Sequence, residues 1–154
     1  MSGNMKGGNI KLGPVLADKR SEWEPLWKAY LDFYRTTVSR ETYDITWSRL
    51  QDPNEPMFVL GAYVDDRLMG IVHYLYHRSC WTIGAYCYLQ DLFVAERARK
   101  LGLGRSLIEA VYQEARAAGA SRVYWLTHET NATARSLYDT LAERPGFIQY
   151  RKIF

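Results

Sequence analysis

Two glycines and three basic residues meet between an apolar run and an amphipathic run. The segment reads Arg99-Lys100-Leu101-Gly102-Leu103-Gly104-Arg105. Glycine has no Cβ, so backbone N–H groups in such a turn can approach a ligand closely. The first N–H groups of a following helix have no partner within the helix, and the helix dipole favours negative charge there. The segment therefore predicts a phosphate or pyrophosphate site.

Two common nucleotide-binding loops do not fit this segment. A dinucleotide fingerprint needs a third glycine where Leu107 stands, and a Walker loop needs a lysine where Arg105 stands. The spacing fits the pattern Arg/Gln-x-x-Gly-x-Gly/Ala instead. The alternative hypothesis is a glycine turn that links a strand to a helix without binding anything.

Motifs on both sides of the loop occur in a recognisable order. Leu89–Val94 precedes the loop, and Asn131, Ala134 and Tyr138 follow it in the pattern Asn-x-x-Ala-x-x-x-Tyr. Together with the loop, these motifs resemble the conserved half of the GNAT N-acetyltransferases over residues 56–153. The resemblance is greatest to the polyamine and histone/polyamine acetyltransferase branch.

The resemblance implies an N-acetyltransferase that binds acetyl-CoA as its co-substrate and needs no metal. The glycine loop would hold the pyrophosphate, and main-chain groups at the end of the preceding strand would pair with the pantetheine arm. Tyr138 would be the general acid that protonates the leaving thiolate, although a tyrosine that simply packs is the alternative. Asn131 would contact the cofactor, cap the following helix, or do both. The cofactor-binding residues that the resemblance implies are Leu92, Phe93, Val94, Arg99, Lys100, Leu101, Gly102, Leu103, Gly104, Arg105, Asn131, Ala134 and Tyr138.

The general base is left open by the sequence. In the polyamine acetyltransferases that this chain resembles, a glutamate occupies the place of Gln90, and glutamine cannot accept a proton at neutral pH. Gln90 and Asp91 are the residues expected beside the amine. Asp91, His128 and Glu129 are local candidates for the base. A water chain to solvent is a further candidate, because a small fraction of a primary amine is neutral at pH 7 to 8.

The resemblance implies direct transfer of acetyl to a primary amine in a ternary complex. The acceptor would be a polyamine, a small amine or amino acid, or a lysine side chain. The alternatives are a non-catalytic acyl-CoA-binding module and a protein or histone lysine acetyltransferase. Many members of the family pair, which implies a homodimer.

The composition limits the protein to an ordinary globular class. Of its 154 residues, 47% are apolar and 24% are charged, and this length and composition predict a single domain over residues 9–154. Residues 1–8 are polar and glycine-rich, which predicts a loose tail. No apolar run reaches the ~18 residues of a membrane span, and no signal-peptide core is visible. Two cysteines without metal or redox spacing fit a cytoplasmic protein. The net charge of +3 is too small to indicate nucleic-acid binding.

Hydrophobic periodicity predicts an α/β (α+β) domain. Its central sheet is expected to be mixed and mainly antiparallel, with flanking helices, as in the GNAT acyl-CoA N-acyltransferase fold. The first helix should begin at a capping box formed by Ser21 and Glu24, and the second helix after Ser39. The other helices are expected over residues 103–118 and 132–141, and the strands over 10–15, 58–64, 68–76, 85–94, 121–126 and 146–153.

Two further features of the sequence have competing interpretations. The aromatic residues of the first helix form its core stripe or shape the acceptor pocket; they are Trp23, Trp27, Tyr30 and Tyr34. His73 and His77 would lie about 13 Å apart on a strand, too far for one metal.

Overall fold

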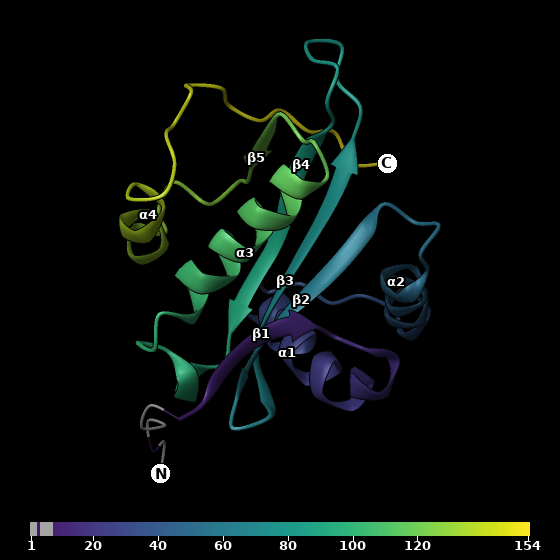
Figure 1. The fold of residues 1–154 in the computed structure, drawn as a ribbon, viewed down its shortest axis with the longest axis vertical. Coiled ribbons are helices and arrows are strands. Elements are labelled where there is room, and N and C mark those ends of the chain that lie inside the picture. The colour runs from purple at the N-terminus through teal and green to yellow at the C-terminus, as the bar shows by residue number, and fades with distance from the viewer. Residues whose placement is uncertain (1–2, 4–7) are drawn as a thin grey trace.

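Five strands form one sheet, and helices cover both of its faces (Figure 1). The computed structural model describes residue 3 and residues 8–154. The strands are β1 (Ile10–Pro14), β2 (Met57–Val64), β3 (Arg67–His77), β4 (Tyr86–Val94) and β5 (Arg122–Tyr124). The helices are α1 (Arg20–Phe33), α2 (Arg40–Gln51), α3 (Leu103–Ala117) and α4 (Ala132–Tyr138), with short 3-10 turns η1 (Ala17–Lys19) and η2 (Glu96–Ala98).

The sheet is mixed and mainly antiparallel, as predicted. The strand order is β1-β2-β3-β4-β5. The first three pairings are antiparallel, and β4 pairs with β5 in parallel. The helical segment between β4 and β5 is long enough to carry the chain back across the sheet, as a parallel pairing requires.

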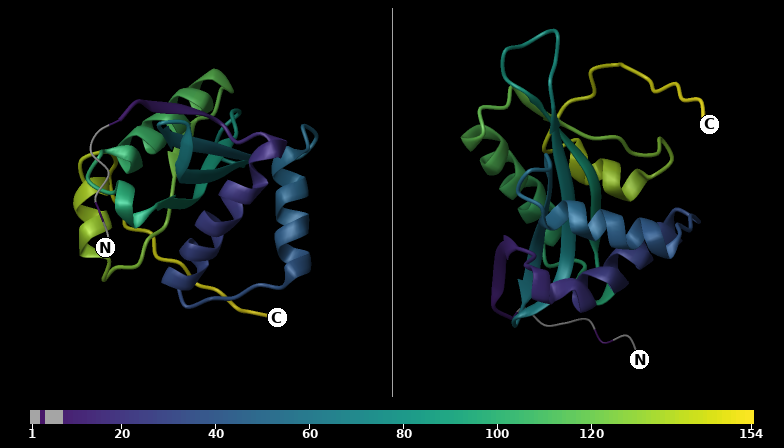
Figure 2. Two further views of the ribbon diagram at one scale, coloured as in Figure 1. Left: turned by 90° about the horizontal axis from the view of Figure 1, so that it is seen from below. Right: turned by 90° about the vertical axis from the view of Figure 1, so that its right-hand side faces the viewer.

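Two apolar cores share the sheet, one on each face. The helices α1 and α2 pack on one face and α3 on the other (Figure 2), and Leu137 and Tyr138 of α4 pack against the core that α3 covers. Successive side chains of β3 serve different cores, because strand residues alternate between faces. Ile71 packs with Trp23 of α1, and Val72 packs with Leu107 of α3. All four side chains are almost completely buried.

The start of α1 differs from the prediction. Ser21 lies inside the helix, and the N-cap residue Lys19 makes no side-chain cap hydrogen bond. The predicted capping box is therefore wrong, because η1 leads directly into α1 and leaves no separate terminus at Ser21. Glu24 pairs instead with Arg40 of α2. The cap predicted for α2 is correct, since Ser39 Oγ accepts a hydrogen bond from the Thr42 N–H at 3.1 Å.

The strand predicted over residues 146–153 is absent, and β5 and α4 are each three residues shorter than predicted. The segment from residue 143 to residue 154 has no regular structure and runs away from the sheet (Figure 2). Its large side chains are exposed, with Phe147 at 79% and Tyr150 at 88%. The apolar run predicts a strand, but a strand needs a hydrogen-bonded partner, and β5 offers an edge of only three residues.

The predicted tail over residues 1–8 falls mostly outside the described residues. At its end, the Asn9 N–H donates to the Asp65 carboxylate at 3.0 Å. Within the described part of the chain, no helix is both long enough and apolar enough to cross a membrane.

Candidate active site

The strands β4 and β5 separate after three paired residues. Their pairs run from Tyr86 with Arg122 to Tyr88 with Tyr124. Beyond Tyr88, the edge of β4 that faces β5 has no strand partner among the described residues. Unpaired main-chain groups need another partner, such as water or an extended ligand. Of the predicted pantetheine-pairing positions, Leu92 and Val94 present their main-chain groups to this free edge, whereas the main chain of Phe93 faces β3.

A β-bulge interrupts β4 at Gln90. His73 of β3 pairs with Asp91, whereas the next residue, Tyr74, pairs with Leu89. Gln90 is therefore the extra residue, and its side chain is exposed. A bulge bends a strand and changes where the neighbouring side chains point. In this protein it aligns Asp91 with His73, on the face that α1 covers.

Asp91 ends a buried chain of hydrogen bonds. The Trp23 indole N–H donates to His73 Nε2 at 3.0 Å, and His73 Nδ1 lies 3.0 Å from Asp91 Oδ2. Because an indole nitrogen can only donate, Nε2 must accept, so the ring proton is on Nδ1 and faces the carboxylate. The side chains of His73 and Asp91 are only 8% and 11% exposed. The chain fixes the orientation of the Asp91 carboxylate.

Three tyrosines surround this carboxylate. Burial raises the pKa of Tyr30 far above its usual range, and the charge of Asp91 and a hydrogen bond to it add to the effect. Burial also raises the pKa of Tyr34 and of Tyr88, again with a contribution from the Asp91 charge. All three phenols therefore keep their protons at neutral pH. A carboxylate among aromatic rings is a suitable environment for an ammonium ion.

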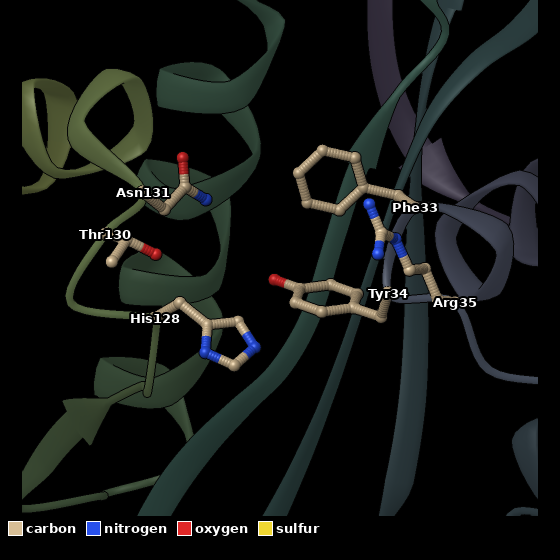
Figure 3. A pocket seen from close by; sticks show the side chains of 6 residues that line it. All are labelled: Phe33, Tyr34, Arg35, His128, Thr130 and Asn131. Atoms are coloured by element: carbon tan, nitrogen blue, oxygen red, sulfur yellow. The ribbon is translucent and has the colours of Figure 1, made fainter.

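A pocket of about 510 Å³ opens between the end of α1 and the loop before α4. Figure 3 shows its two walls, one formed by Phe33, Tyr34 and Arg35 and the other by His128, Thr130 and Asn131. The hydroxyl of Tyr34 points into the gap between them. The Tyr34 ring lies 5.7 Å from the His128 ring and 4.9 Å from the Tyr30 ring, measured between centroids. Tyr34 thus links the pocket to the tyrosines around Asp91.

Tyr138 is held by packing between α4 and the sheet. Its ring centroid lies 5.4 Å from that of Trp125. Burial raises the pKa of Tyr138, and Tyr34 adds to the shift. The phenol therefore remains a proton donor at neutral pH. Tyr34 contributes to the raised pKa of Tyr138, and the Asp91 charge contributes to the raised pKa of Tyr34, so the predicted acid and the carboxylate both lie within electrostatic range of this one tyrosine.

Two residues of the glycine loop have left-handed backbone conformations. Lys100 and Gly102 have φ values of 69° and 76°, in the left-handed region. The Ser106 N–H donates to the Gly102 carbonyl at 3.1 Å, so the three preceding N–H groups at the start of α3 have no helical partner. A Cβ built on Gly104 would meet only Leu137, at an ordinary 3.6 Å. Protein packing therefore does not require glycine at position 104.

Several predicted residues have contacts of their own in this structure. Arg99 Nε donates to the Val94 carbonyl at 3.3 Å, which occupies that main-chain group, and Arg105 donates to the Thr140 hydroxyl at 2.9 Å. Asn131 caps α4, its side-chain oxygen accepting from the Ala134 N–H at 3.4 Å, and it also lines the pocket.

The three candidates for the general base are separated by the fold. Asp91 belongs to the buried chain, and His128 lines the pocket. The side chain of Glu129 is exposed, and its carbonyl accepts a hydrogen bond from Arg135 at 2.6 Å. Phe33, Arg35 and Thr130 also line the pocket and were not predicted, because no sequence motif marks them.

His73 and His77 have different partners. His73 belongs to the chain that ends at Asp91, whereas His77 Nε2 lies 2.7 Å from the Tyr124 hydroxyl. Among the residues that the structure describes, no three potential metal-ligating side chains gather in one place.

Known acetyltransferases resemble this chain in sequence and in fold. The sequence profile of the Acetyltransferase (GNAT) family matches residues 23–142. A D-amino-acid N-acetyltransferase of Saccharomyces cerevisiae is 36% identical over 132 residues, which cover 84% of this chain and 82% of the yeast protein. A thialysine N-epsilon-acetyltransferase of Caenorhabditis elegans is 31% identical over 95 residues, covering 58% of this chain and 59% of the relative. The crystallised aminoglycoside N-acetyltransferase AAC(6')-Iy in complex with CoA has a TM-score of 0.80 at 16% identity, covering 96% of this chain and 97% of that chain.

Proposed function

Because the chain belongs to the GNAT family of N-acetyltransferases, we propose that it acetylates a small primary amine that binds beside Asp91, with acetyl-CoA as the donor. The observation that carries this proposal is the Trp23–His73–Asp91 chain of hydrogen bonds. It holds a carboxylate at the bulge of β4, next to the free edge of that strand. The amine attacks the thioester directly in a ternary complex, without a covalent enzyme intermediate.

The start of α3 fits the pyrophosphate of CoA. Three unpartnered N–H groups, from Leu103, Gly104 and Arg105, lie at the positive end of the helix dipole, beside the basic residues Arg99 and Lys100. Bound acetyl-CoA supplies the activated acetyl group and the thiolate leaving group.

The edge of β4 fits the amide-containing arm of the same molecule. Main-chain groups of successive strand residues point to opposite edges, so Leu92 and Val94 face the β5 side and Phe93 faces β3. The main chain of Leu92 is free on the side facing β5, whereas Arg99 occupies the Val94 carbonyl. The start of α4, at Asn131 and Ala134, completes the proposed donor site on the other side of the opening between the strands.

Asp91 is the proposed amine anchor and general base. An ammonium ion would be attracted by the carboxylate and by the faces of the surrounding tyrosines. The amine must lose a proton to become a nucleophile. His73 and Tyr30 each donate one hydrogen bond to the carboxylate, and its two oxygens have about four acceptor sites, so capacity remains to accept that proton. Gln90 then has no part in the proton transfer, which agrees with its lack of a basic group.

Tyr138 is the proposed general acid. Its raised pKa keeps it protonated at neutral pH. Donation from a phenol of pKa about 10 to a thiolate of pKa about 8.5 is uphill by roughly 2 kcal/mol, and burial of the phenol adds to this cost. The transfer is compatible with enzymatic rates, because a step of this size is a small part of a typical barrier.

The names of two relatives support a free small molecule as the acceptor. D-amino acids and thialysine are both amino acids, so the two relatives act on free amines. The test is release of the CoA thiol from acetyl-CoA with a panel of amino acids, polyamines, aminoglycosides and basic peptides. Acceleration by free amines supports the proposal. If CoA binds and no amine accelerates thiol release, the chain is an acyl-CoA-binding module, and preference for basic peptides would indicate a protein acetyltransferase.

We also propose that the chain forms a homodimer through its C-terminal segment, residues 146–154. Five large apolar or aromatic side chains of this segment are exposed to solvent: Phe147, Ile148, Tyr150, Ile153 and Phe154. In addition, β5 is an edge strand of the sheet, and its outer side has no strand partner among the described residues. Exposed apolar segments and open strand edges favour strand addition by another chain. Sedimentation equilibrium of the full chain should give a dimer, and Ile148→Lys should weaken it. A wild-type monomer at micromolar concentration would contradict this proposal.

A further inference from the structure

An arginine occupies an unfavourable backbone conformation at the end of α1. Arg35 has a φ of 53°, in the left-handed region that glycine usually takes after a helix. The turn is closed by hydrogen bonds from the Arg35 N–H to the Asp32 carbonyl at 3.0 Å and from the Thr36 N–H to the Leu31 carbonyl at 2.9 Å. A glycine would close the same turn with less strain. The capping geometry therefore does not explain an arginine at this position.

The Arg35 side chain points into the pocket. Figure 3 shows its guanidinium beside Phe33 and Tyr34, facing the wall that carries Asn131. Of the six side chains that line this pocket, Arg35 is the one with a permanent charge. Strained residues occur at ligand-binding positions when the surrounding structure over-determines them.

Charges of opposite sign lie near Tyr34. Arg35 lines the same pocket as Tyr34. The Tyr34 ring lies 4.9 Å from the ring of Tyr30, which hydrogen-bonds to Asp91, and the Asp91 charge contributes to the raised pKa of Tyr34. An amino acid carries the matching pair of charges, an ammonium and a carboxylate. A planar guanidinium binds a carboxylate through two parallel N–H···O hydrogen bonds, which fixes its orientation as well as its position.

We propose that Arg35 binds the carboxylate of an amino-acid substrate whose amine lies at Asp91. This inference rests on the proposed function and adds a specificity-determining residue to it. Arg35 distinguishes amino acids from polyamines and other amines that lack a carboxylate. It positions the acceptor and has no part in the proton transfers.

The test compares an amino acid with its carboxamide, which keeps the amine and removes the negative charge. For each pair, kcat/KM is measured from thiol release with wild type, Arg35→Gly and Arg35→Gln. We expect both substitutions to lower kcat/KM for the amino acid by about 10- to 100-fold and to leave the carboxamide almost unchanged, since one charge-assisted contact is lost. Arg35→Gly should also unfold at a Tm about 2–4 °C higher, because it removes the left-handed strain.

The control is Arg49→Gln, which removes an exposed arginine from α2. This substitution should leave kcat/KM unchanged for both the amino acid and its carboxamide. Equal losses for the amino acid and the carboxamide, or no loss for either, would overturn the assignment of Arg35. A raised KM for acetyl-CoA in the Arg35 variants would place this residue in the donor site and would overturn it as well. If the wild type accepts no free amine at all, the proposed function itself fails and the inference falls with it.

Discussion

The substitution Asp91→Asn tests the proposed anchor and base with little change in shape. The amide oxygen can still accept the hydrogen bond from His73 Nδ1, so the buried chain to Trp23 remains intact. The negative charge and the proton acceptor are both removed. An ammonium and a carboxylate about 4 Å apart attract each other by ~4 kcal/mol at an effective dielectric constant near 20.

Desolvation of the two ions offsets part of that attraction. A net loss of about 3 kcal/mol corresponds to a decrease of about 100-fold in kcat/KM through amine binding. Loss of the general base lowers kcat by a further factor of about 100 or more. We therefore expect kcat/KM for the amine to fall by about 10,000-fold, while the Kd of acetyl-CoA and the Tm stay close to the wild-type values.

The assay is thiol release at saturating acetyl-CoA with varied amine, supported by calorimetric binding of acetyl-CoA and thermal unfolding. The matched control is Asp18→Asn, which neutralises an exposed aspartate in η1. A kcat/KM for Asp91→Asn within about threefold of wild type, a difference below ~0.7 kcal/mol, would refute the role given to Asp91.

Three further predictions concern the acid, the donor site and stability. Tyr138→Phe should lower kcat about 100-fold with little change in the Kd of acetyl-CoA, since it removes a general acid and little else; wild-type kcat where chemistry limits turnover would exclude this role. Gly104→Asp should abolish calorimetric binding of acetyl-CoA through bulk and negative charge, and its Tm should stay near wild type because a Cβ meets only ordinary contacts there; tight binding would contradict the phosphate site. The Glu22 carboxylate accepts hydrogen bonds from Lys19 Nζ at 2.8 Å and the Leu68 N–H at 3.1 Å, and the Lys19 contact is the main reason that its pKa lies below the usual 4.5. The ionised Glu22 carboxylate makes its full contribution to stability above pH 4.5, and this contribution is lost as the pH falls through the lower folded-state pKa. Glu22→Gln should therefore lower the free energy of unfolding by about 1 kcal/mol at neutral pH and by less in acid. A difference in unfolding free energy that is independent of pH would contradict this.

Local sequence signals were sufficient for most of the fold. Apolar runs bounded by turns located β2, β3 and β4, and helical periodicity located α3, whose end is marked by Gly119 with a φ of 75°. The Ser39 cap was also predictable, because a cap depends on residues close together in the chain. The capping box at Ser21 and the strand over residues 146–153 were wrong, because a preceding 3-10 turn and a missing strand partner outweighed a favourable local pattern.

The donor loop and the acceptor site differ in how much the sequence alone determined. The turn from Arg99 to Gly104 is a contiguous segment, so its composition and spacing predicted a phosphate site. The resemblance to the family indicated acetyl-CoA as the acetyl donor. The acceptor site is assembled from distant segments, with Trp23 bonded to His73 and Arg35 in one pocket with Asn131. Whether Gln90 or Asp91 faces that site depended on a one-residue bulge in β4. A bulge is decided by the pairing of neighbouring strands, and therefore only the tertiary structure placed Asp91 in the buried chain and Arg35 in the pocket.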